Sequence, residues 1–213
     1  MKTNRNNIEL EINGKASNLV AEYYLKKGKN NIKMIIKNKI TNLSKMFYEC
    51  NRLKDINELQ YLNTKYCNNF SNMFSWCSSL SDIKALEKWN VSNCNNFESM
   101  FCENSSLIDI KPLEKWNVSN CNNYSKMFSE CSSLLDIKSL EKWNVSNCNN
   151  FSFMFNGCSS LSDIKPLEKW NVSNCNNFRG MFYGCSFSNV NIIEKWNVSN
   201  QKYFEDMIKK PDW

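Results

Sequence analysis

The chain has 213 residues, 42% of them hydrophobic and 13% aromatic, so it holds enough apolar material for a continuous core in one elongated domain. The net charge is +6, and the absence of histidine excludes Ser-His-Asp, Cys-His and histidine proton-shuttle chemistry within the chain. No apolar run approaches the roughly 18 residues that a membrane helix needs, so no membrane span is expected.

The N-terminal segment, residues 1–40, carries the excess of positive charge. It holds nine Lys and Arg residues against three Glu residues, whereas the rest of the chain is neutral. Apolar residues alternate with glutamates over Ile8–Ile12, and Asn13-Gly14 follows as a hairpin turn signal. Leu19–Leu25 and Ile32–Ile36 have the pattern of two more strands. We therefore expect residues 1–40 to form a basic, antiparallel β cap.

A Met-Phe pair recurs six times at a spacing of 27 residues, from Met46-Phe47 to Met181-Phe182, and a seventh pair, Met207-Ile208, follows after 26 residues. A column of tryptophans keeps the same spacing. A period in this range indicates stacked supersecondary units. The sequence therefore predicts an α/β repeat solenoid over residues 41–200. Residues 201–213 should form a charged capping helix that gives the last unit a polar outer face.

Two apolar patterns divide each unit of 27 residues. Trp170 and Val172 alternate with polar neighbours at period 2, which indicates an extended segment with a short strand. The next apolar residues, over 178–185, follow at i, i+3, i+4 and i+7, which places them on one face of a short helix. A helix of about two turns is not stable alone, so stacking against neighbouring units must hold it in place.

The repeated aromatic, methionine and cysteine positions are the expected core of the stack. A row of partly exposed tryptophans could instead form an aromatic binding strip, and this alternative stays open. The expected core ladder consists of Trp89, Trp116, Trp143, Trp170, Trp196, Met100, Phe101, Met127, Phe128, Met154, Phe155, Met181, Phe182, Cys94, Cys121, Cys148 and Cys175.

Ten of the eleven cysteines fall into two columns with the spacing of the repeat. The first column consists of Cys67, Cys94, Cys121, Cys148 and Cys175, and the second of Cys50, Cys77, Cys131, Cys158 and Cys185, with Asn104 at one position of the second. Neighbouring rungs lie ~4.8 Å apart, whereas a disulfide needs Cβ atoms ~3.8 Å apart that face each other. A metal site has no support, because the chain lacks both histidine and a C-x-x-C motif. We expect buried, reduced thiols and no cofactor, with Cys102, which lies outside both columns, the most exposed.

Carboxylates also recur in columns, whereas a catalytic site would break the repeat symmetry, so no enzymatic activity is expected. The Asp and Glu columns are interpreted as a solvated charge ladder paired with the Lys columns. The Asn-x-Ser sequons, at Asn90 and its equivalents and at Asn104, are interpreted as turn asparagines, with glycosylation as the alternative. The candidate partner-binding residues are the exposed charges of this ladder: Lys88, Lys115, Lys142, Lys169, Glu87, Glu114, Glu141 and Glu168.

The repeats resemble a known family. The run Lys169-Trp-Asn-Val-Ser-Asn174, combined with the Met-Phe pair and a Cys-Ser-Ser-Leu run at constant spacing, is similar to the BspA-like leucine-rich repeat surface proteins. This family includes a branch described as a domain of unknown function. The resemblance implies a leucine-rich-repeat-like solenoid that is used for protein binding or surface adhesion, and it implies no catalytic residues.

Three functional hypotheses follow. The first is a non-enzymatic protein-protein interaction scaffold that binds an unidentified protein partner and no small-molecule substrate. The second is a structural or adhesive protein of a cell or virion surface. The third is nucleic-acid contact through basic residues of the cap, namely Lys26, Lys27, Lys29, Lys33, Lys37 and Lys39. This contact is not expected, because only Tyr23 and Tyr24 offer aromatic rings on which bases could stack there.

The localisation prediction rests on the start of the chain. Residues 1–7 lack the apolar stretch of a secretory signal, so we expect the cytoplasm or another reducing intracellular compartment. The resemblance implies the alternative, which is the cell surface or secretion.

Overall fold

The computed structural model describes residues 8–17, 27, 31–187, 191–196 and 207–208. The cap is a three-stranded antiparallel sheet in the order β2-β1-β3, formed by β1 (Ile8–Ile12), β2 (Lys15–Ser17) and β3 (Ile32–Ile36). Asn13 and Gly14 join β1 to β2 with φ of 51° and 79°, the positive values that a two-residue hairpin turn requires. The strand expected over Leu19–Leu25 lies outside the described residues.

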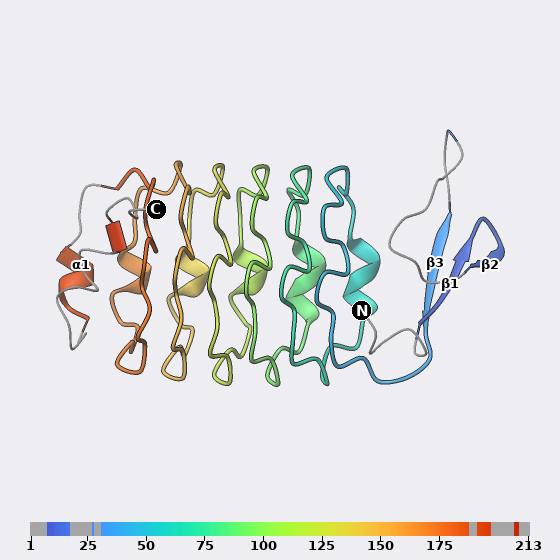
Figure 1. The fold of residues 1–213 in the computed structure, drawn as a ribbon, viewed down its shortest axis with the longest axis horizontal. Helices are drawn as coiled ribbons and strands as arrows, with labels where there is room; N and C mark the ends of the chain where they lie inside the picture. Colours follow the sequence, from blue (N-terminus) through green and yellow to red (C-terminus); the bar gives the residue numbers. More distant parts are fainter. Residues whose placement is uncertain (1–7, 18–26, 28–30, 188–190, 197–206, 209–213) are drawn as a thin grey trace.

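From Asn42 onward the chain winds into successive coils that lie side by side along one axis (Figure 1). Each coil takes up one 27-residue repeat. Neighbouring coils are joined by isolated parallel β-bridges between equivalent asparagines, such as Asn69 with Asn96 and Asn96 with Asn123. The assignment of this stack to the leucine-rich repeat solenoids, and the division of the chain into three domains, stay predictions.

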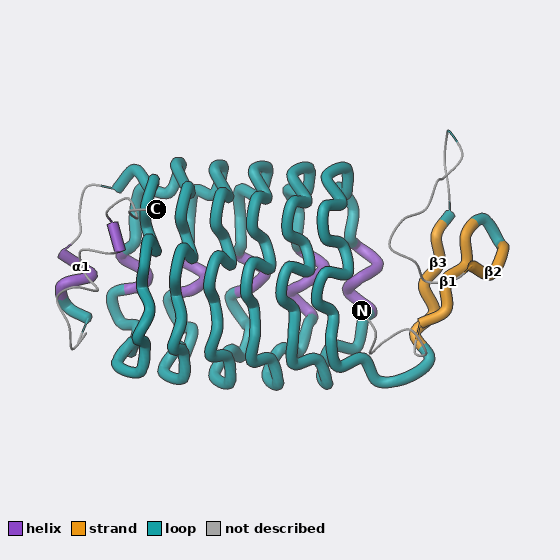
Figure 2. The backbone as a smooth tube through the Cα atoms, viewed as in Figure 1, coloured by secondary structure: helices purple, strands orange, loops and turns teal. Residues whose placement is uncertain are grey.

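The coils are mostly loop, and each carries one short helix on the same side of the stack (Figure 2). Among the described residues, five of these are 3-10 helices, and the one that follows them is a single α-helical turn. Their bounds are η1 Asn57–Tyr61, η2 Lys84–Lys88, η3 Lys111–Leu113, η4 Lys138–Leu140, η5 Lys165–Leu167 and α1 Asn191–Glu194. Of the expected C-terminal capping helix only Met207 and Ile208 are described, and their backbone is helical.

The position of the helix within each unit was predicted wrongly. The short helices lie in the half that was expected to be extended, and the expected helix over 178–185 is a pair of consecutive turns. Gly180 and Gly184 have φ of 59° and 76°, and non-glycine residues hold positive φ at the same places in earlier coils. A residue in the left-handed conformation at every fourth position prevents a right-handed helix from continuing through the segment. Because turns of four residues bury nearly the same positions as a 3.6-residue helix, the apolar pattern did not separate the two.

Backbone hydrogen bonds in these turns alternate between the coil itself and the next coil. Met100 N donates to Phe97 O within the turn (3.1 Å), and Phe101 N donates to Met127 O of the following coil (2.9 Å). A second ladder runs the other way, because Asn122 N donates to Asn95 O of the preceding coil (3.2 Å). Each coil is thus hydrogen-bonded to both neighbours. These bonds satisfy backbone N–H and C=O groups of the irregular segments, although the coils contain no long strands.

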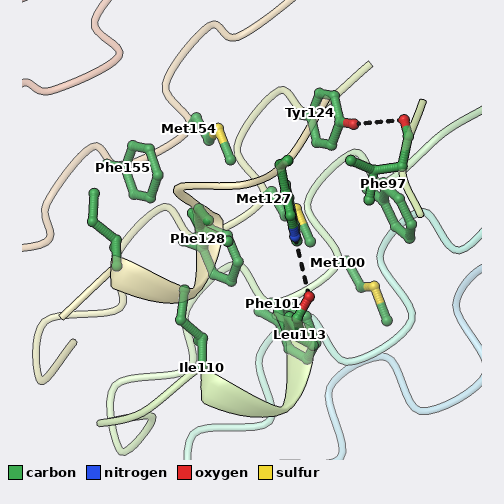
Figure 3. Packing of buried hydrophobic residues seen from close by; sticks show 14 of the residues in the cluster. Phe97, Met100, Phe101, Ile110, Leu113, Tyr124, Met127, Phe128, Met154 and Phe155 are labelled. Atoms are coloured by element: carbon green, nitrogen blue, oxygen red, sulfur yellow. Dashed lines mark hydrogen bonds between the residues drawn. The ribbon is translucent and has the colours of Figure 1, made fainter. Parts of the chain in front are cut away.

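The core runs through the whole stack as one cluster of buried apolar side chains. Equivalent residues from successive coils occupy equivalent places, as Met100, Met127 and Met154 do in Figure 3. The cluster extends to Ile8 of the cap and to Met207 near the C-terminus. Phe182 N donates to Met207 O (2.9 Å), the bond that Phe155 N makes to Met181 O one coil earlier, so the last repeat stacks like the others although it is one residue short.

Candidate functional site

The tryptophan column is core, so the alternative of an aromatic binding strip is wrong. The five rings are 4–5% exposed, and Trp89 stacks on Trp116 with centroids 6.4 Å apart and planes 4° apart. Each indole N–H donates to a leucine carbonyl of the preceding coil, as Trp116 Nε1 does to Leu86 O at 2.9 Å. The column therefore supplies burial, ring stacking and one hydrogen bond per coil.

The phenylalanines of the Met-Phe pairs form a parallel ladder beside the tryptophans. Phe101, Phe128 and Phe155 stack in succession with centroids 5.7 Å apart (Figure 3). The methionines and phenylalanines of the predicted core ladder are fully buried or nearly so. Tyr124 joins a further aromatic column and donates its buried hydroxyl to Val118 O (3.2 Å). These side chains are occupied by packing and cannot also hold a ligand.

The cysteine columns are mostly buried, and all eleven cysteines are free thiols in the structure. In the second column each buried thiol donates to a phenylalanine carbonyl, as Cys131 Sγ does to Phe101 O at 3.1 Å. Burial raises the pKa of Cys67 and Cys77 to about 12. The expectation for Cys102 was wrong in one respect, because Cys102 is half-buried and Cys50, in the first coil, is the exposed thiol.

The aspartates and asparagines form turns that recur in every coil. Asp109 Oδ1 accepts from Lys111 N (2.7 Å) at the start of η3, and the Asp residues of the other coils accept in the same way. In the sequon column, Asn117 Oδ1 accepts from both the backbone N–H and the hydroxyl of Ser119. Asn104 is fully buried, which makes its sequon inaccessible. Asn197 lies outside the described residues.

The predicted partner-binding lysines and glutamates lie on the surface and pair across coils. Lys115 Nζ lies 3.0 Å from Glu87 Oε1, and Lys142 Nζ lies 3.7 Å from Glu114 Oε1. The hydrogen bond from Lys115 lowers the pKa of Glu87. Lys88, in the second coil, instead donates to Gln60 of the first coil (2.8 Å). Of the remaining candidates, Glu141 and Lys169 are exposed, and half-buried Glu168 pairs with Lys195.

Sequence reasoning missed an apolar pair on the same surface. Ile108 and Leu135 are 50% and 58% exposed, and they are equivalent residues of adjacent coils. Leu135 N donates to Ile108 O (3.4 Å), and Asp109 and Asp136 form a parallel bridge beside them. The sequence did contain a signal for this pair, because the equivalent positions of other coils carry the polar residues Lys54, Ser81 and Ser162. This pair lines a groove together with Lys111, Glu114, Lys138, Glu141 and Lys142.

Two of the cap lysines that the structure describes have partners within the chain. Lys37 forms an ion pair with Glu9 across the sheet, and Lys39 Nζ lies 4.4 Å from the ring centroid of Tyr66. Lys27 and Lys33 are exposed. The remaining lysines of the nucleic-acid hypothesis, Lys26 and Lys29, and both of its tyrosines lie outside the described residues, so that hypothesis stays a prediction.

The described residues contain neither a cluster of metal-ligating side chains nor a membrane-spanning helix. No group of three or more Cys, Asp or Glu residues there is arranged to hold a metal ion. None of the described helices is long and apolar enough to cross a membrane.

A family comparison accounts for nearly the whole stack. One family's sequence profile matches residues 17–137 and, a second time, residues 104–212. The chain belongs to DUF285, described as a Mycoplasma protein of unknown function. The two overlapping matches to DUF285 follow from the repeat, since the same profile fits different sets of coils. No curated protein and no solved structure matches the chain.

Proposed function

We propose that this DUF285 chain is a non-enzymatic protein-interaction scaffold, built as a leucine-rich-repeat-like solenoid of the BspA-like type. The observation that carries the proposal is the exposed pair Ile108 and Leu135. A repeat that buries its other aliphatic columns has no packing use for two half-exposed aliphatic side chains on adjacent coils. Exposed apolar residues with a polar rim are typical of protein interaction surfaces.

The charges around the pair give the surface its specificity. Glu114, Glu141 and Lys142 were candidates from the sequence, and they line the same groove as the apolar pair. Exposed ion pairs between coils contribute little to stability, roughly 0–1 kcal/mol each. The charged side chains can therefore leave an ion pair within the chain and form one with another protein at a small cost in free energy. In the complex they orient the partner protein, while Ile108 and Leu135 supply the apolar contact.

The test replaces the apolar pair with the serine that two other coils carry. The double variant Ile108→Ser/Leu135→Ser restores the repeat and should leave the melting temperature close to that of the wild type. Proteins cross-linked to the wild type in the native cell, then purified and titrated against it, should bind the variant at least tenfold more weakly.

The matched control is Ser81→Ala/Ser162→Ala, which alters the same column at the two positions that carry serine and should bind normally. If purified partners bind the Ile108→Ser/Leu135→Ser variant as tightly as the wild type, the proposed surface is wrong.

A further inference from the structure

Trp76 differs from the other described tryptophans in its environment. It is 49% exposed, whereas the five tryptophans of the core ladder are 4–5% exposed. It occupies a turn column in which neighbouring coils carry Glu49 and Glu103, and later coils carry Gly157 and Gly184. Its backbone is held like theirs, with φ of 64° and Trp76 N donating to Cys102 O (2.8 Å). The stacking of the coils therefore accounts for the backbone conformation of Trp76, but it gives no reason for a large exposed indole ring at this position.

The ring lies in a groove between carboxylates. Glu49, Asn51, Trp76, Ser78, Glu103 and Ser105 line this groove, which crosses three adjacent coils. Glu49 and Glu103 belong to the two coils that flank the coil of Trp76, and all three residues line the groove. The groove therefore combines one large aromatic face with two carboxylates and has no basic lining residue.

The carboxylates of this groove differ from those of the lysine and glutamate columns. There, Glu87, Glu114 and Glu168 each face a lysine of the next coil. Within the described ranges, no Lys or Arg forms an ion pair with Glu49 or Glu103. Burial, and then the charge of Glu130, raises the pKa of Glu103. Hydrogen bonding to Glu49 raises the pKa of Tyr48, so Glu49 has a neutral partner but, among the described residues, no cationic one.

Three other exposed or half-buried rings of the stack are covered by cations of the chain itself, whereas Tyr61, which is 75% exposed, has no such cation among the described residues. Lys39 lies over Tyr66 at 4.4 Å and Lys45 over Tyr48 at 5.7 Å, and Phe153 has a lysine and an arginine at 5.8 and 5.9 Å. Over the part of the chain that the structure describes, no such cation covers Trp76. Tryptophan is the ring that attracts cations most strongly.

We propose that the groove around Trp76 binds a lysine or arginine side chain from a basic peptide segment of a partner protein. The cation lies on the indole face, and its N–H groups donate to the carboxylates of Glu49 and Glu103. Charge complementarity selects this occupant, because a neutral or acidic segment would leave both carboxylates without a cationic partner at the contact. The site uses none of the residues of the Ile108 and Leu135 groove, so it stands independently of the function proposed above.

The test measures fluorescence anisotropy of a labelled arginine-rich peptide, and of a labelled lysine-rich peptide, titrated with the full chain. The decisive variant is Trp76→Glu, which installs the residue that the column carries on both sides and which the left-handed backbone accommodates there. Loss of a cation–π contact should weaken binding about 3- to 30-fold. A purely electrostatic groove would bind more tightly with the added charge, and that result would overturn the proposal.

Three further measurements complete the test. Trp76→Phe keeps a ring and should lose less affinity than Trp76→Glu, and Glu103→Gln should weaken binding and reduce its salt dependence. Glu58→Gln, which removes an exposed carboxylate on η1, should bind like the wild type. Equal binding by all four variants would overturn the proposal. Self-association that Trp76→Glu abolishes would identify the basic cap of a second copy as the occupant and overturn the assignment to a partner protein.

Discussion

Replacing Asn104 with cysteine should stabilise the coil stack. Asn104 takes the place that cysteine holds in neighbouring coils, and its side chain is fully buried. Among the described residues neither its Nδ2 nor its Oδ1 has a hydrogen-bond partner. In adjacent coils the thiols of Cys77 and Cys131 donate to phenylalanine carbonyls at 3.1 Å. The substitution Asn104→Cys removes two unpaired polar atoms and offers the thiol the same kind of carbonyl.

The magnitude follows from the cost of unpaired buried polar groups. Each such group costs about 1–3 kcal/mol, and small shifts of the amide in the folded protein recover part of that sum. We therefore expect Asn104→Cys to raise the free energy of unfolding by about 1–3 kcal/mol. For a chain of this length that corresponds to a rise of about 2–12 °C in melting temperature.

The measurement is urea unfolding followed by circular dichroism, under reducing conditions so that no disulfide contributes. The matched variant is Cys131→Asn, which places the same amide at the equivalent position one coil later and should lose a similar amount. The reasoning is refuted if Asn104→Cys has an unchanged or lower urea midpoint, or if Cys131→Asn costs nothing.

Three more predictions test other parts of the structure. Trp116→Phe loses an indole hydrogen bond and buried ring area, so urea unfolding should show a loss of about 1–3 kcal/mol; no loss would contradict the core role of the column. Iodoacetamide at pH 8 should modify exposed Cys50 well before Cys77, whose pKa is about 12, as peptide mass spectrometry would show; equal rates would contradict the burial. Because burial raises the pKa of Glu103 in the folded state, its stabilising contribution is present at low pH and lost as pH rises through that pKa. The free energy of unfolding of Glu103→Gln should therefore rise relative to that of the wild type between pH 4 and pH 7. A difference between the two proteins that stays constant over this range would refute the raised pKa of Glu103.

The periodic part of the structure could be predicted from the sequence. Columns of Trp, Met-Phe and Cys are buried as expected, because a residue repeated in every coil stacks on its own equivalents. The helix position could not be predicted, since turns of four residues and a helix bury almost the same positions. The glycines at these left-handed positions, Gly157, Gly180 and Gly184, were a local signal, but most earlier coils carry other residues there.

The candidate surface was predicted only in part. Reasoning from repetition favoured the Lys and Glu columns, whose candidate residues are exposed except for half-buried Glu168. The same reasoning passed over Ile108, Leu135 and Trp76, because each departs from its column in one or two coils. Their exposure depends on which way the side chain leaves the coil, and an apolar residue in a largely apolar repeat gives no sign of that before the backbone is known.

The two opposed hydrogen-bond ladders have an evolutionary consequence. Since every coil donates to its neighbours through bonds that are the same at each step, a duplicated or deleted unit of 27 residues leaves each junction chemically unchanged. The length of such a chain can therefore change by unequal recombination within its own gene, without any compensating substitution. Natural variants of different length should then share the same end units, while the number of identical middle units varies freely.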